Sequence, residues 1–415
     1  MKTMIEPVES NSQSYVPWLI SAAVVALAFG GVGGSLQISR IVCILILPVA
    51  LARLLSFTSK VKFQTETLVF IFLLMIISLT SIVWSIDKAS TMQYLVVMMI
   101  NLIPLLMIAL LTPGEAENLR QLLPRAWLLA GVAVLPLAIY ELTTGNHFAL
   151  GFEERGGGTM VNLLPFASGV HGNYNDFSLF LVLCIFGTCF AKNNKSDINK
   201  RAQYFKYSII ALISMVVVIN SSRAAILCLA AILFARFILP LRKGHFISIF
   251  ILVAIFAGFS ISLWDNDSLL LKFLQLKFTD FSNDFEASEG RLAILISGLK
   301  GFFDSFGLGV GAGASSSYLA TDKAILIPNP HNLLLEWALN FGLIGFCLLL
   351  WFISRMWSAN KKNNNDINRR LNYVAILILP LLGVIQSHLT GYTYFWLMLS
   401  TMAAFAIWPA LPKKG

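Results

Sequence analysis

Three cationic side chains stand where the sequence changes from polar to apolar. Arg223 follows a pair of serines and precedes an apolar run, Arg291 precedes a second run, and His331 lies between Pro330 and a third. A guanidinium group can hold a phosphate through two parallel hydrogen bonds, and an imidazole can take up a proton near neutral pH. These residues could therefore bind an anion and supply a base.

Each of the three residues also has a structural interpretation. Arg223 could be an interfacial anchor, because a cation at the mouth of a membrane span must snorkel or meet an anion. Arg291 could pair with Glu289, Glu286 or Asp284. A lone histidine such as His331 is more often a hydrogen-bonded structural residue than a base. The sequence leaves these alternatives open.

Three further polar residues lie near the starts of apolar runs. His171 ends a polar loop and is a weaker candidate for a base than His331. Asp176 and Glu336 each lie just inside a following apolar run, where a carboxylate is costly. Either carboxylate could orient a hydroxyl or pair with an arginine.

The glycine-rich stretch Gly307-Leu-Gly-Val-Gly-Ala-Gly313 is a weak nucleotide fingerprint. No strand is expected before it, and no Lys-Ser or Lys-Thr pair follows it. Permissive backbone turns close to lipid or substrate are the better explanation.

The elements that position these residues are membrane helices. Hydrophobic residues make up 57% of the 415 residues, charged residues only 12%, and the mean hydropathy is +0.76, far from the balance of soluble domains. A span needs about twenty mostly apolar residues, and the sequence predicts an all-α polytopic membrane protein with about twelve spans. The predicted windows are Val16–Gly33, Ile38–Phe57, Thr67–Trp84, Tyr94–Leu111, Leu122–Leu142, Tyr174–Ala191, Phe205–Asn220, Ala224–Leu241, Phe246–Trp264, Leu333–Met356, Leu371–Leu389 and Tyr394–Leu411.

The distribution of charge predicts the orientation of these spans. With the N-terminus inside, the cytoplasmic segments hold 21 of the 30 lysines and arginines, and the outer segments hold 14 of the 21 acidic residues. This asymmetry follows the positive-inside rule and places both termini in the cytoplasm. It also explains the net charge of +9 without a nucleic-acid-binding face. The outward basic residues are Arg40, Lys88, Arg155, Arg223, Lys272, Lys277, Arg291, Lys300 and Lys323.

We expect one integral membrane domain over residues 1–415, with two long outward loops at 143–173 and 265–332. The second loop is too long for a passive connector. Within it, Ser288 and Glu289 precede an apolar-periodic stretch, which predicts a capped amphipathic helix lying on the membrane or on the bundle, with Arg291 in its first turn.

The sequence gives no indication of a metal or cofactor. The outer segments carry no acidic pair with metal-ligand spacing, no HExxH and no CxxC. Cys43, Cys184, Cys189, Cys228 and Cys347 all fall in apolar runs and are expected to be small residues facing lipid or the core. Arginines would have to provide the positive charge of a site.

Several short motifs, in this order, resemble those of the O-antigen ligase and polymerase superfamily of bacterial envelope glycosyltransferases. They are Asn173-Tyr-Asn-Asp-Phe177, Ser222-Arg-Ala224, Arg291 with Gly-Leu-Gly-Val-Gly at 307–311, Pro330-His-Asn-Leu333, and Gly342 with Gly345. The resemblance covers roughly the C-terminal two thirds of the chain, since the first five spans match only in hydropathy.

The resemblance implies a GT-C-like membrane fold and metal-independent transfer of a glycan from undecaprenyl diphosphate at the periplasmic face of the bacterial inner membrane. By this likeness Arg223 and Arg291 hold the diphosphate, and His331 activates the acceptor hydroxyl. In a ligase of lipopolysaccharide biosynthesis the acceptor is lipid A–core, and in a polymerase it is another carrier-linked repeat unit. We favour the ligase.

A membrane transporter is the alternative from a different class, because twelve spans is also the count of many carriers. Against this alternative, the two halves show no internal resemblance, and no pair of broken spans occurs at matching positions. The long outward loop at 265–332 is also not expected of a carrier.

Overall fold

We analysed the protein as a computed structural model. It describes residues 14–30, 37–57, 61–147, 166–171, 173–190, 200–220, 222–238, 285–322, 325, 328–363, 365–385 and 389–407. Of residues 223, 238 and 285–291 only the helical backbone is described.

The described residues form helices and connecting turns, without a strand. In chain order the elements are α1 (Val16–Ala26), η1 (Leu27–Phe29), α2 (Ile38–Leu55), α3 (Lys62–Thr80), η2 (Ser81–Val83), α4 (Lys88–Ala109), α5 (Pro113–Thr144), α6 (Tyr174–Cys189), α7 (Lys200–Ile219), α8 (Arg223–Leu233), η5 (Phe234–Ile238), α11 (Phe285–Asp304), α12 (Ser315–Leu319), α13 (Leu333–Asn360), α14 (Asp366–Ile385), η7 (Leu389–Gly391) and α15 (Thr393–Ile407).

The predicted polytopic all-α fold is confirmed. Seven described helices are long and apolar enough to cross a membrane, and four shorter apolar helices accompany them. These eleven helices coincide with eleven of the twelve predicted windows, and the remaining window, Phe246–Trp264, lies outside the described residues. Cys43, Cys184, Cys189 and Cys228 are buried, and Cys347 is exposed on α13.

Aromatic rings and small residues pack the interior of the bundle. Phe70 of α3 stacks on Phe352 of α13 with ring centroids 4.1 Å apart. Gly187 of α6 lies directly under the Trp127 ring, whose indole N–H donates to the Thr401 hydroxyl at 3.0 Å and so joins α5 to α15. Because a buried indole N–H needs an acceptor, this contact also fixes the orientation of the ring.

The ends of the helices gather in two regions, which we call the basic end and the loop end. At the basic end, Arg53 of α2 pairs with Glu115 of α5, and Arg355 of α13 pairs with Glu66 of α3. At the loop end lie the first turns of α6, α8, α13 and α15 together with residues 305–313, the glycine turn. The charge distribution predicts that the basic end faces the cytoplasm.

The glycine turn is built into the fold at a break in α13. Gly342 leaves the helical conformation with φ 66° and ψ −168°. The Leu343 N–H next to this break donates to the Gly307 carbonyl at 2.7 Å, and the Leu339 carbonyl before it accepts from the Val310 N–H at 2.7 Å. Irregular backbone at membrane depth is tolerated only where protein or water satisfies its polar groups, and here the glycine turn satisfies them.

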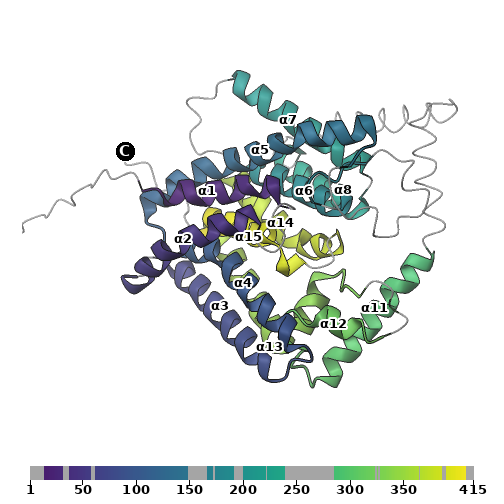
Figure 1. The fold of residues 1–415 in the computed structure, drawn as a ribbon. Helices are drawn as coiled ribbons and strands as arrows, with labels where there is room; N and C mark the ends of the chain where they lie inside the picture. The colour runs from purple at the N-terminus through teal and green to yellow at the C-terminus, as the bar shows by residue number, and fades with distance from the viewer. Residues whose placement is uncertain are drawn as a thin grey trace, which may run out of the picture.

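The loop helix differs from its prediction at its start. Helix α11 begins at Phe285, so Ser288 lies inside the helix and is not its cap, and Arg291 lies near the end of the second turn. The backbone of Arg291 is therefore about 9 Å along the axis from the first residue, and the proposed anion site beside the helix N-terminus loses its support. Figure 1 shows α11 and α12 gathered beside α13 and the start of α4, across the fold from α7.

Candidate active site

The first turn of α13 is tied to the turn before α15 by a buried carboxylate. Glu336 accepts hydrogen bonds from the N–H groups of Leu389 at 3.0 Å and Thr390 at 3.2 Å, and also from the Thr390 hydroxyl. An unpaired buried carboxylate would be costly, whereas one that accepts several N–H and O–H bonds is stable. Glu336 therefore orients a hydroxyl, as the sequence predicts, and that hydroxyl belongs to Thr390 in the η7 turn.

Two tyrosines surround the same turn. The Tyr94 hydroxyl of α4 donates to the Thr390 hydroxyl oxygen at 2.7 Å. The buried Tyr394 hydroxyl at the start of α15 lies within electrostatic range of the Asp176 and Glu336 carboxylates. Asp176 and Glu336, which are far apart in the sequence, thus both act electrostatically on Tyr394.

Arg40 is a buried cation at this site that the sequence analysis counted only as an outward charge. It lies in the first turn of α2, and its guanidinium donates to the Gly391 carbonyl at 2.9 Å. The side-chain amide of Asn101 donates to the same carbonyl at 3.2 Å, and its oxygen accepts from the Thr393 hydroxyl at 2.8 Å. The η7 turn is thus held by side chains from α2, α4 and α13.

His331 occupies an uncommon backbone conformation directly before α13. Its φ is 45°, in the left-handed region that a non-glycine residue enters only at a cost. Buried Pro330 precedes it, and the Asn332 side chain after it caps α13 by accepting from the Leu334 and Leu335 N–H groups. Pro330 and Asn332 therefore fix the backbone position of His331, from which its side chain extends.

Helix α11 carries Arg291 along the same part of α13. Gly298 packs against the Leu335 side chain, and Gly307, in the turn that follows α11, meets Leu343 farther along α13. The two helices therefore run in the same direction, and the backbone of Arg291, about 10 Å before Gly298, lies toward the level of the residues that precede α13. The side chain of Arg291 lies outside the described part of the structure.

The start of α8 is fixed to the start of α6 by Asn220. Its side-chain amide donates to the Ala167 carbonyl at 2.8 Å and to the Ser178 hydroxyl at 3.0 Å, and its oxygen accepts from the Ala167 N–H. Arg223, the first residue of α8, follows three positions later, which confirms the predicted short turn. The backbone of Arg223 is thus placed near the first turn of α6, which carries Asp176.

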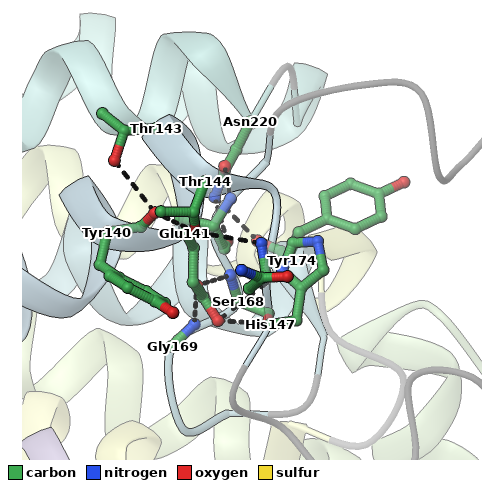
Figure 2. Close-up of polar contacts among 11 residues, drawn as sticks. Tyr140, Glu141, Thr143, Thr144, His147, Ser168, Gly169, Tyr174 and Asn220 are labelled. Atoms are coloured by element: carbon green, nitrogen blue, oxygen red, sulfur yellow. Dashed lines mark hydrogen bonds and ion pairs between the residues drawn. The ribbon is translucent and has the colours of Figure 1, made fainter.

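A second buried carboxylate, Glu141 of α5, organises the loop before α6. Figure 2 shows Glu141 facing Ser168, Gly169 and His147. The carboxylate accepts from the N–H groups of Ser168 and Gly169, both at 2.7 Å, and lies 3.7 Å from the His147 Nδ1 atom. A carboxylate inside a predicted span is a sequence signal for this residue, but Glu141 was not predicted.

His171 is packed among aromatic rings. Its imidazole stacks on Phe180 with centroids 4.7 Å apart and meets Phe177 at 5.5 Å. Burial lowers the pKa of His171 to about 4, because desolvation disfavours the charged imidazole. A group with so low a proton affinity is a poor general base at neutral pH, so His331 stays the predicted base.

Within the described ranges, no group of three or more histidine, cysteine, aspartate or glutamate side chains could hold a metal ion. Metal independence stays a prediction.

Part of the chain is similar to known proteins. The sequence pattern of the family described as O-antigen ligase matches residues 208–350, a range that includes Arg223, Arg291, His331 and the glycine turn. A protein of Salmonella muenchen named O-antigen polymerase is 24% identical over 286 residues, which cover 64% of this chain and 70% of the relative. Both matches support the resemblance of this chain to the O-antigen ligase and polymerase superfamily. His171 and Asp176 lie outside the matched range of the O-antigen ligase family.

Proposed function

We propose that this chain is an O-antigen ligase-type glycosyltransferase. It moves a glycan from undecaprenyl diphosphate to a sugar hydroxyl of lipid A–core at the periplasmic face of the inner membrane. The observation that supports this proposal most is the strained backbone of His331 at the loop end, since residues held at positive φ cluster at functional sites. Arg223 is the first residue of α8, which follows the contact of Asn220 with the start of α6. Arg291 lies in α11, which packs against α13.

In the proposed reaction His331 takes the proton of the acceptor hydroxyl as the oxygen attacks the anomeric carbon. The bond between that carbon and the diphosphate oxygen breaks, and the diphosphate leaves with the electron pair. Arg223 and Arg291 stabilise the leaving group, because guanidinium groups bind phosphate oxygens in pairs. The imidazole then releases its proton to water, and undecaprenyl diphosphate is the second product.

The protein residues around η7 have a supporting role in this proposal. Glu336, Tyr94 and Arg40 fix the turn that abuts the first turn of α13. Since His331 is two residues before α13, displacement of that helix start would move the imidazole relative to the acceptor. A misplacement of about 1 Å can cost 10²-fold in rate.

Two substitutions of His331 separate its imidazole from its backbone. Glycine and asparagine both tolerate φ near 45°, so His331→Gly and His331→Asn should keep the fold and lose the base. We expect transfer to fall about 10² to 10⁴-fold, the usual contribution of general base catalysis, in a purified assay with a lipid-linked glycan and lipid A–core. Near-normal transfer by both variants, with unchanged melting temperature, would remove His331 from the reaction.

The arginine roles are tested by a graded pair of substitutions. Arg223→Ala and Arg291→Ala should abolish transfer while the protein still inserts, and the lysine variants should recover it only partly because an ammonium cannot present a planar fork. Donor binding in the His331→Asn variant serves as the matched control, since it retains both arginines. Normal polysaccharide ladders from the alanine variants would contradict the assignment.

Polymerase activity is the second candidate, favoured by the name of the Salmonella muenchen relative. The two activities use the same donor and differ only in acceptor. Purified protein supplied with the lipid-linked repeat unit and either lipid A–core or a second carrier-linked repeat unit will distinguish them. Extension of the carrier-linked glycan without transfer to lipid A–core would establish the polymerase.

Metal independence has its own test. Transfer should survive a chelator, because the proposed electrophile is a pair of arginines. Loss of activity in EDTA that Mg²⁺ or Mn²⁺ restores would overturn this part of the proposal.

A further inference from the structure

Helix α11 packs on the protein through a stripe of small residues. Gly298 approaches the Leu335 side chain of α13, and Gly301 approaches the Tyr318 ring of α12. Ile294 on the same face joins a small apolar cluster with Leu335 and neighbouring residues. These contacts hold α11 against α12 and α13.

The opposite face of α11 is also apolar. Its exposed large side chains are Leu292, Leu295, Ile296, Leu299 and Phe303, and Phe306 and Leu308 of the glycine turn continue the row. Phe306 is 95% exposed. Exposed Lys300 and Asp304 lie beside this row, and the row itself is apolar throughout. Contiguous apolar surface of this kind marks an interaction site.

The depth of the glycine turn indicates what covers this face. The Gly307 carbonyl accepts from the Leu343 N–H, and Leu343 and Ile344 of the membrane helix α13 are themselves 54% and 66% exposed. Leu343 precedes Arg355, whose pairing with Glu66 marks the basic end, by about 18 Å of helix. The hydrocarbon core is about 30 Å thick, so we expect Gly307 to lie inside it, in the half nearer the loop end. The turn then returns toward the loop end, where the Val310 carbonyl accepts from the Ile86 N–H just before α4.

We propose that α11 is a re-entrant helix whose outward face and Phe303–Leu308 tip are inserted in the bilayer. The occupant of this surface is the acyl chains of the lipid leaflet at the loop end. The apolar row on α11 is continuous with the exposed residues of α13, which a polytopic protein presents to lipid. The small-residue stripe lets α11 lie close to α13, so that both helices share one lipid-facing surface.

Spin labels test this placement independently of any transfer activity. In a Cys347→Ala background, which removes the exposed native thiol, single cysteines are introduced by Leu292→Cys, Leu299→Cys, Leu308→Cys and Phe306→Cys. The labelled proteins are reconstituted in phosphatidylethanolamine and phosphatidylglycerol vesicles. Collision with oxygen, which partitions into lipid, is compared with collision with a water-soluble nickel chelate. Exposed Thr321, as Thr321→Cys, is the matched control in the same loop.

We expect the ratio of oxygen to nickel accessibility to rise from Leu292→Cys toward Phe306→Cys and Leu308→Cys and to exceed that of Thr321→Cys several-fold. Nickel access at Phe306→Cys equal to that at Thr321→Cys would mean that the tip is in water. Low access to both reagents would mean that a protein surface covers it. Either result overturns the proposal, and if Phe306→Cys does not fold, Leu308→Cys and Leu299→Cys decide it.

Discussion

The carboxylates at the two ends of the bundle have different hydrogen-bond partners. At the basic end, Glu115 accepts two hydrogen bonds from the Arg53 guanidinium, and Glu66 pairs with Arg355. The arginine side chains of these pairs remain 26% and 32% exposed. These contacts join one helix to another through arginine side chains that water still reaches, and Glu115 accepts in addition from the Thr112 N–H at 3.0 Å at the start of α5.

At the loop end, carboxylates hold the backbone of turns. Glu141 and Glu336 are almost fully buried, and each accepts from two consecutive backbone N–H groups. Partly exposed ion pairs contribute little to stability, whereas a buried N–H group that loses its acceptor carries the full cost of its desolvation. The loop end should therefore respond far more strongly to loss of a carboxylate, and it is the end where the candidate active site needs a fixed geometry.

The largest effect is expected from Glu141→Ala. It leaves the N–H groups of Ser168 and Gly169 without their acceptor, at about 1 to 3 kcal/mol for each buried donor. Stability can be followed with a thiol-reactive dye in the Cys347→Ala background, because the buried Cys43, Cys184, Cys189 and Cys228 become reactive on unfolding. A melting temperature equal to that of the parent would contradict the assigned role of Glu141.

The next largest loss of stability is expected in the glycine turn, which packs against α13. Gly309 has φ +80°, and a Cβ there would lie 2.5 Å from the Leu339 carbonyl oxygen. Gly309→Ala should therefore destabilise the protein by about 1 to 3 kcal/mol through backbone strain. Gly114→Ala near the start of α5 is the matched control, since nothing lies within 4 Å of its Cβ position. Equal melting temperatures for the two variants would show that the packing of the turn is looser than we describe.

A smaller effect is expected at the basic end. Glu66→Gln removes the charge that pairs with Arg355 and keeps the size of the side chain. The free energy of unfolding should fall by about 1 kcal/mol or less, and the difference should shrink as salt is added. A loss as large as that of Glu141→Ala would show that the two ends do not differ in the way proposed.

The features that the sequence predicts correctly are the local ones. Eleven described helices match predicted windows because a span is a local property of about twenty apolar residues. The short turn before Arg223 and the junction at His331 were also visible, since helix starts carry local signals such as the Asn332 cap. Cap signals can also mislead: Ser288 looks like a helix start, yet α11 begins at Phe285.

The contacts that build the site could not be predicted, because they join residues far apart in the chain. Glu336 and Thr390 belong to different helices, and no residue near Glu336 in the sequence predicts that its carboxylate accepts from the η7 turn. The glycine turn was recognised as permissive backbone, but the reason for the glycines is the close approach of α13, which only the folded chain supplies. Arg40 has no motif around it in the sequence. Its hydrogen bond to the Gly391 carbonyl forms only because the fold brings α2 next to η7.

The smallest effect at neutral pH, and the most specific, concerns His171 at the loop end. Burial lowers its pKa from the ordinary value of about 6.5 to about 4, so the unfolded chain takes up a proton at a higher pH than the folded one. The contribution to stability is therefore complete above about pH 6.5, is lost as the pH falls from there toward about 4, and changes little below. His171→Phe keeps a ring against Phe177 and Phe180 and removes the titrating group. The difference in melting temperature between parent and variant should be constant above pH 7 and should shift in favour of the variant between pH values of about 6 and 4.5, where the variant loses less. If the difference between the two proteins stays constant over that range, His171 does not enter the folded state as a buried neutral imidazole, and the packing described for the loop before α6 is wrong.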